Sequence, residues 1–134
     1  MAVADCRFWL AVLNLRMDKT EFKKRTKAFV IDIAKFCLSL PPDKIVRHYV
    51  DQIVRSSASA GANYRAACRA KSKADFINKL RIVEEEADES LYFLELICKF
   101  YPDKRAEIAK LYKEEDQLLA MIVSSINTAL SRAK

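Results

Sequence analysis

The sequence contains little of what turns, nucleotide-binding loops and metal sites require. Its 134 residues include 1 glycine, 3 prolines and 1 histidine. β-Sandwiches and barrels need many turn residues, and phosphate-binding loops need glycines at fixed spacing. The chain fits neither class, and its composition favours a helical protein with short connections. Its length corresponds to one compact domain.

The cysteines and the histidine form no metal-binding motif. Cys6, Cys37, Cys68 and Cys98 are separated by about thirty residues each, and none belongs to a Cys-x-x-Cys pair. We therefore expect reduced thiols in a cytoplasmic protein that holds no metal and no cofactor. The apolar segment 8–15 is too short to cross a bilayer and no basic segment precedes it, so we expect neither a secretory signal nor a membrane partner.

Four segments show apolar residues at three- and four-residue steps, the pattern of amphipathic helices. The expected helices cover residues 19–39, 43–70, 72–101 and 104–131, and the prolines at 41, 42 and 102 separate two of the pairs. The expected N-caps are Thr20, Asp43, Ser72 and Asp103. Such short connections predict an all-α fold, an antiparallel up-down four-helix bundle over residues 19–134.

Residues 1–18 stand apart from this pattern as an N-terminal extension. They are too apolar for a free tail. Either they form a short helix that packs on the bundle or on a neighbouring subunit, or translation starts at Met17 and the preceding residues are an upstream extension.

The third expected helix is apolar on more than one face. Its main stripe runs from Phe76 to Cys98, and several large apolar residues lie off that stripe: Ile77, Tyr92, Phe93, Leu96 and Ile97. A helix with so much apolar surface is central or lies at a subunit contact. The sequence therefore predicts a homo-oligomer.

The net charge of +6 is unevenly distributed along the chain. Residues 44–81 contain nine basic and two acidic residues, whereas residues 82–103 contain one basic and seven acidic residues. This distribution suits a polyanion on the basic side or head-to-tail contact between copies, or it gives two solvated helix faces. The residues expected to contact phosphate are Arg55, Arg65, Arg69, Lys71, Lys73 and Lys79. Tyr49 and Tyr64 are expected to add aromatic surface. No base-reading motif is present, so an RNA or DNA contact would depend on charge and shape.

The sequence offers no set of catalytic residues. The acidic run 84–89 lacks the Glu-x-x-His pairs of di-metal bundles. His48 lies about two helical turns before Ser56 and Ser57, too far along the same helix to act as their base. We expect no enzymatic activity and no small-molecule substrate. A second acidic run, 114–116, is expected to form a solvated patch on the last helix.

Small and polar residues in the second helix indicate a packed junction. Ser56, Ser59, Gly61 and Asn63 are expected to pack or hydrogen-bond where this helix meets a neighbour. Glu86 and Glu89 are expected to accept hydrogen bonds from an arginine or from polar donors there. Plain helix packing is the alternative role for the serines.

Three segments carry a resemblance to a known family. The first matches an R-S-x-x-S-x-G-A-N pattern at Arg55, Ser56, Ser59, Gly61, Ala62 and Asn63. The second matches S-K-x-x-F-I-x-K-L at Ser72, Lys73, Phe76, Ile77, Lys79 and Leu80. The third matches E-E-A-D-E-[ST]-x-Y-W-L-E-L at Glu85, Glu86, Ala87, Asp88, Glu89, Ser90, Tyr92, Leu94, Glu95 and Leu96. Over residues 19–130 the chain resembles the four-helix bundle proteins encoded in intervening sequences of bacterial 23S rRNA genes.

The resemblance implies a small cytosolic bundle that assembles as a ring, typically a pentamer, without known enzymatic activity. It also points to a nucleic-acid role, partly from the position of the gene and partly from a similar pentameric protein that accompanies reverse transcriptases. The alternative is a protein-interaction scaffold or accessory subunit for a partner enzyme. The chain departs from the family pattern at Ala66, where glutamate is common, and at Phe93, where tryptophan is frequent.

Overall fold

The computed structural model describes residues 18–132, and within that range all regular secondary structure is helical. The elements in chain order are α2 (Lys19–Leu38), α3 (Lys44–Ala67), α4 (Lys73–Phe100), the short 3-10 helix η1 (Pro102–Lys104) and α5 (Arg105–Ser131). The expected all-α class is confirmed, and each expected helix boundary lies within three residues of the observed one. The expected N-terminal extension lies outside the described residues except for Asp18.

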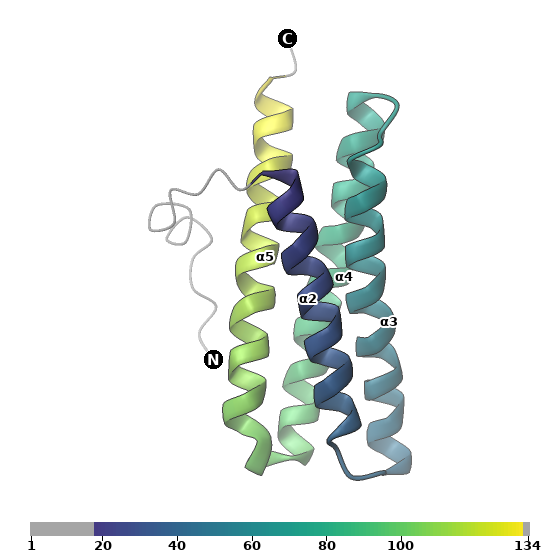
Figure 1. The fold of residues 1–134 in the computed structure, drawn as a ribbon, viewed down its shortest axis with the longest axis vertical. Coiled ribbons are helices and arrows are strands. Elements are labelled where there is room, and N and C mark those ends of the chain that lie inside the picture. The colour runs from purple at the N-terminus through teal and green to yellow at the C-terminus, as the bar shows by residue number, and fades with distance from the viewer. Residues whose placement is uncertain (1–17, 133–134) are drawn as a thin grey trace.

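The four long helices lie side by side, and the chain reverses direction at each connection (Figure 1). α3 packs against α2 and α4, and α5 packs against the same two helices. The end of the molecule that is uppermost in Figure 1 therefore carries the beginnings of α2 and α4 and the ends of α3 and α5. None of the helices within residues 18–132 has the apolar stretch that crossing a membrane requires.

Two of the four expected N-caps are correct. The Asp43 carboxylate accepts hydrogen bonds from the backbone N–H groups of Ile45 and Val46, at 2.9 and 3.0 Å. Ser72 Oγ accepts from the Asp75 N–H at 3.0 Å. Each side chain satisfies N–H groups that the first turn of a helix leaves without a partner.

The other two expected N-caps are wrong. α2 is capped by Asp18 and not by Thr20, because the Asp18 carboxylate accepts from the Glu21 N–H at 2.7 Å. A negative charge at this place also interacts favourably with the helix dipole. Asp103 does not cap α5, because it lies within the 3-10 turn and α5 begins two residues later, at Arg105, without a side-chain cap.

The apolar stripes of the helices meet in the interior of the bundle. The large apolar side chains that are almost completely buried are Ile33, Ile53, Leu80, Leu94, Ile97, Ile108 and Ile122. Tyr64, expected to be aromatic surface, lies in this core instead. Its ring centroid is 4.3 Å from that of Phe22, and only 8% of the residue is exposed. The α2–α3 contact covers it.

Three cysteines fall within the described residues, and all three are free and half-buried: Cys37, Cys68 and Cys98. Burial raises the pKa of the Cys37 thiol to about 11. At neutral pH this group is therefore a protonated thiol that packs as a small apolar side chain.

Candidate functional site

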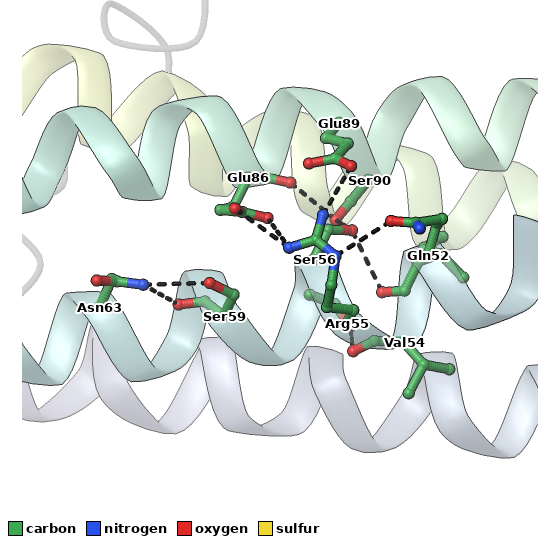
Figure 2. Close-up of polar contacts among 11 residues, drawn as sticks. Gln52, Val54, Arg55, Ser56, Ser59, Asn63, Glu86, Glu89 and Ser90 are labelled. Atoms are coloured by element: carbon green, nitrogen blue, oxygen red, sulfur yellow. Dashed lines mark hydrogen bonds and ion pairs between the residues drawn. The ribbon is translucent and has the colours of Figure 1, made fainter.

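Arg55 connects α3 to α4 through an exposed ionic junction. Its Nη1 lies 3.1 Å from Glu86 Oε2, and its Nη2 lies 2.7 Å from Glu89 Oε1 (Figure 2). Its Nε donates to Gln52 Oε1 on α3 at 3.1 Å. The hydrogen bond to Glu89 and the two carboxylate charges hold the pKa of Arg55 above its usual range. All three guanidinium nitrogens are engaged, so this arginine is less available to an external phosphate than an unpaired one.

Two buried serines join the same helices beneath this junction. Ser56 Oγ lies 2.7 Å from Ser90 Oγ, and neither residue is exposed to solvent. Ser90 also donates to the backbone carbonyl of Glu86 at 3.0 Å. Ser56 Oγ also has a backbone acceptor, the Ile53 carbonyl at 3.4 Å, so either hydroxyl group can be the donor between the two serines. Small hydroxyl side chains here both permit close helix packing and satisfy each other in the core.

The hydrogen bonds of Asn63 remain within α3. Its side-chain nitrogen donates to the backbone carbonyl of Ser59 at 2.9 Å and to Ser59 Oγ at 3.2 Å (Figure 2). Of the four small and polar residues singled out on this helix, Ser56 alone bonds to another helix within the described chain.

Gly61 faces α2. A Cβ atom added there would lie 3.8 Å from Val30 Cγ2 and 3.9 Å from Thr26, which is ordinary van der Waals contact. The packing of α2 on α3 therefore has room for alanine. The close approach expected at this glycine is not demanded by the packing of the described chain.

The basic residues expected to contact phosphate fall into two groups. Arg55 is bound to carboxylates, and Lys79 Nζ lies 4.0 Å from Asp75 Oδ1 one turn away on α4. The remaining four take part in none of the ion pairs formed among residues 18–132: Arg65, Arg69, Lys71 and Lys73. All four are exposed, and they lie where α3 ends and α4 begins. We call these four residues the basic end.

Local capping fixes the shape of this basic end. The Asp75 carboxylate accepts from the Lys71 N–H at 3.2 Å, while Ser72 caps the first turn of α4. These bonds hold Lys71 and Lys73 on either side of a defined helix start. The positive end of the α4 dipole adds to the charge of the two side chains.

Aromatic side chains form a patch between the beginning of α3 and the second half of α4. Tyr49 pairs with Phe93 and Phe100 at centroid distances of 6.4 and 5.8 Å, and Tyr92 pairs with Phe93 at 5.4 Å. Tyr92 and Phe100 are about half exposed, at 55% and 52%. The excess apolar faces expected of the third helix thus include real surface, although Ile97 is buried in the core. We call these four aromatic residues the aromatic seam.

The acidic run on α5 is not the solvated patch that the sequence predicts. Glu115 is 3% exposed, and its Oε2 has no hydrogen-bond partner among the described residues. Burial, with the nearby charge of Glu114, raises the pKa of Glu115 to about 8. Glu114 instead pairs with Arg25 of α2, which also donates to Gln117 at 3.1 Å. The prediction failed although Glu115 lies three residues after Tyr112 and three before Leu118, at helical spacing with the buried stripe.

Ser56 and Ser57 are not positioned for nucleophilic catalysis with His48 as their base. Ser56 and Ser57 are buried at 0% and 2% exposure, whereas His48 is exposed. No group of three histidine, cysteine or acidic side chains within residues 18–132 is arranged to hold a metal ion. What the described surface does present is an unpaired basic end and an aromatic seam.

Two members of the ionic and serine junction were missed in the sequence. Gln52 and Ser90 were not assigned to it, although each lies within one helical turn of a predicted member, Arg55 or Glu86. Ser90 sits between Ala87 and Leu94 in the buried stripe of α4. A small polar residue in such a stripe is a signal for a buried hydrogen bond.

Comparison with known proteins finds a matching family model and a similar solved structure. The family model described as 23S rRNA-intervening sequence protein matches residues 18–124. A crystal structure of a protein of unknown function from the S23 ribosomal protein family of Bacteroides thetaiotaomicron is 32% identical, with a TM-score of 0.75. The match covers 83% of this chain and 99% of the other. Comparison with curated proteins gives no significant match. The chain therefore belongs to the 23S rRNA-intervening sequence protein family.

Proposed function

We propose that the protein is a non-enzymatic, nucleic-acid-binding bundle that works as a ring of identical copies, with five as the expected number. The observation that carries this proposal is the contrast within the basic residues. Arg65, Arg69, Lys71 and Lys73 are exposed and belong to no ion pair within residues 18–132, whereas Arg55 is neutralised by Glu86 and Glu89. Phosphate contacts are made by exposed cations that are not already paired with a carboxylate.

The aromatic seam supports the assembly. Tyr92 and Phe100 are large side chains that expose about half of their surface on a helix that also contributes to the core. Covering such a patch with a second copy removes apolar area from water. In a ring each basic end recurs once per subunit, so symmetry turns a modest charge into an extended positive field.

The aromatic seam also favours one second candidate, a scaffold for a partner protein. Exposed tyrosine and phenylalanine side chains are frequent anchors of protein interfaces. In that case the seam would be covered by the partner, and the basic end would serve solubility or the same partner. The two functions differ in their response to salt, because phosphate contacts weaken steeply as the salt concentration rises.

The test is binding of a labelled RNA duplex to the double variant Arg65→Glu/Arg69→Glu. Reversing two phosphate-contacting charges is expected to lower the affinity by roughly 10- to 100-fold at moderate salt. The matched control is Lys99→Glu/Lys113→Glu, which reverses two exposed charges far from the end of α3. The control is expected to bind nearly as well as the wild type.

Light scattering accompanies this measurement, because a change of assembly would also change affinity. Both variants are expected to keep the mass of the wild-type oligomer. Wild-type affinity in Arg65→Glu/Arg69→Glu would overturn the assignment of the basic end, and a monomeric wild-type protein would overturn the ring.

A further inference from the structure

The register of α2 against α3 brings together basic residues that lie about forty positions apart in the sequence. Phe22 of α2 stacks on Tyr64 of α3, and Thr26 faces the position of Gly61. Lys23 and Lys27 directly follow the two α2 contact residues, and Arg65 directly follows Tyr64. The contacts therefore place the outer edges of the two helices side by side at this level.

Each of the two segments contributes a pair of cations four residues apart. Lys23 and Lys27 lie on α2 and share one face of it. Arg65 lies in the last turn of α3, and Arg69 lies in the turn that follows the last residue of that helix, Ala67. All four are exposed. Packed helix axes are typically about 8–10 Å apart, so the two pairs form neighbouring rows. We call these four residues the two-helix basic face.

The charges of this face are not neutralised within the described chain. None of the four takes part in an ion pair among residues 18–132. Two carboxylates near this face bind other groups. Asp18 caps α2, and Asp75 accepts a hydrogen bond from the Lys71 N–H and lies near Lys79. Like charges at four-residue spacing repel and lower helix stability. The fold thus keeps an unfavourable arrangement that an external polyanion would relieve.

Short side chains on α3 leave the surface beside the face open to an extended phosphate backbone. Ala58 and Ala62 precede Arg65 by seven and three residues, so they continue its side of α3 with short, exposed side chains. The exposed aromatic residues that could anchor a protein partner, Tyr92 and Phe100, belong to α4 instead. Phosphate contacts need cations spread along an open surface and no base-reading geometry.

We propose that Lys23 and Lys27 of α2 bind the phosphodiester backbone of a nucleic acid together with Arg65 of α3 and Arg69 of the turn that follows it. The surface then runs across the α2–α3 contact and continues to Lys71 and Lys73. This inference rests on the proposed function and adds a second helix to its site. The ligand is recognised by backbone charge, so RNA and DNA duplexes are both expected to bind.

The experiment compares Lys23→Gln/Lys27→Gln with the wild type and with the matched control Lys99→Gln/Lys113→Gln. Affinities for an RNA duplex and a DNA duplex of equal length are measured over a range of salt concentrations. Loss of two phosphate contacts is expected to reduce the slope of log affinity against log salt by about two, and to weaken binding by about tenfold or more at low salt. The control is expected to keep the wild-type slope.

A second measurement separates binding from a structural role. Lys23→Gln/Lys27→Gln removes the repulsion between the two lysines, so its thermal unfolding midpoint is expected to equal or exceed that of the wild type while its affinity falls. A residue pair needed only for folding would show the opposite change in the midpoint.

Three outcomes would overturn the inference, and they are distinguishable. A wild-type salt slope in Lys23→Gln/Lys27→Gln, with binding lost in Arg65→Glu/Arg69→Glu, would reject the α2 residues and leave the proposed function standing. Absence of salt-dependent binding by the wild type would reject the proposed function itself. Displacement of RNA by poly-glutamate at equal charge concentration would show that an acidic polypeptide suits the face as well as a nucleic acid does.

Discussion

Arg55 and Arg65 lie ten residues apart on the exposed side of the same helix, yet they differ in their ionic partners. Arg55 reaches across to α4 and is bound by Glu86 and Glu89. Arg65 belongs to no ion pair within residues 18–132, and it directly follows Tyr64, whose ring contacts Phe22 of α2. A count of basic residues along the sequence cannot distinguish them. Whether a cation is available to a ligand is decided by what the neighbouring helix places opposite it.

The same comparison extends to the interior, where an unpaired charged group has a much larger energetic effect. An exposed unpaired lysine remains hydrated, whereas a buried carboxylate loses its water and must take up a proton. Glu115 is the buried example in this bundle, and the serines of the α3–α4 junction are the buried groups that do have partners.

The largest expected effect is on Glu115. Burial raises its pKa to about 8 from an ordinary 4.5, so between these values the folded chain binds a proton that the unfolded chain has released. With respect to Glu115, the free energy of unfolding has its full value below pH 4.5 and decreases as the pH rises toward 8. Glu115→Leu is expected to raise the free energy of unfolding by roughly 3 kcal/mol at pH 7 and to flatten its pH dependence.

Urea unfolding at several pH values measures this effect. Glu107→Gln, an exposed position on the same helix, serves as the control and is expected to keep the wild-type pH dependence. A loss of stability in Glu115→Leu would show that the carboxyl group has a stabilising partner in the assembled protein.

A smaller effect is expected where the buried polar groups are satisfied. Ser90→Ala removes the side-chain partner of Ser56 and the hydrogen bond to the Glu86 carbonyl, and is expected to lower the free energy of unfolding by about 1–2 kcal/mol. Ser56→Ala/Ser90→Ala removes both hydroxyl groups and is expected to lose less than the sum of the single variants. Additive losses in chemical unfolding would mean that the two hydroxyl groups do not interact.

Much of the fold follows from local signals in the sequence. Pro41 and Pro42 end the first helix, Asp43 and Ser72 begin the next two, and apolar periodicity identifies the core. The caps that were missed depended on geometry beyond one residue type. Asp18 and Thr20 are both good capping residues, and Asp103 is prevented from capping by the 3-10 turn that contains it.

The candidate site was less accessible to sequence analysis, because it depends on which helices touch. The sequence predicts that Glu86 and Glu89 bind an arginine or polar donors, but the identity of Arg55 as the partner depends on the α3–α4 register. Lys23 and Lys27 stayed outside the predicted basic stretch because they lie about forty residues from Arg65 and reach it through the Phe22–Tyr64 contact. The sequence predicts an exposed Tyr64 because the helical pattern of α3 does not show that Phe22 of α2 packs on it.

The most direct measurement of whether unpaired cations contact the ligand is the salt dependence of RNA binding by Arg55→Met and by Arg65→Met. Each variant removes one positive charge from an exposed position on α3, so they serve as controls for each other. Arg65→Met is expected to reduce the slope of log affinity against log salt by about one, and Arg55→Met is expected to keep the wild-type slope. Equal losses in the two variants, or a loss confined to Arg55→Met, would contradict the account.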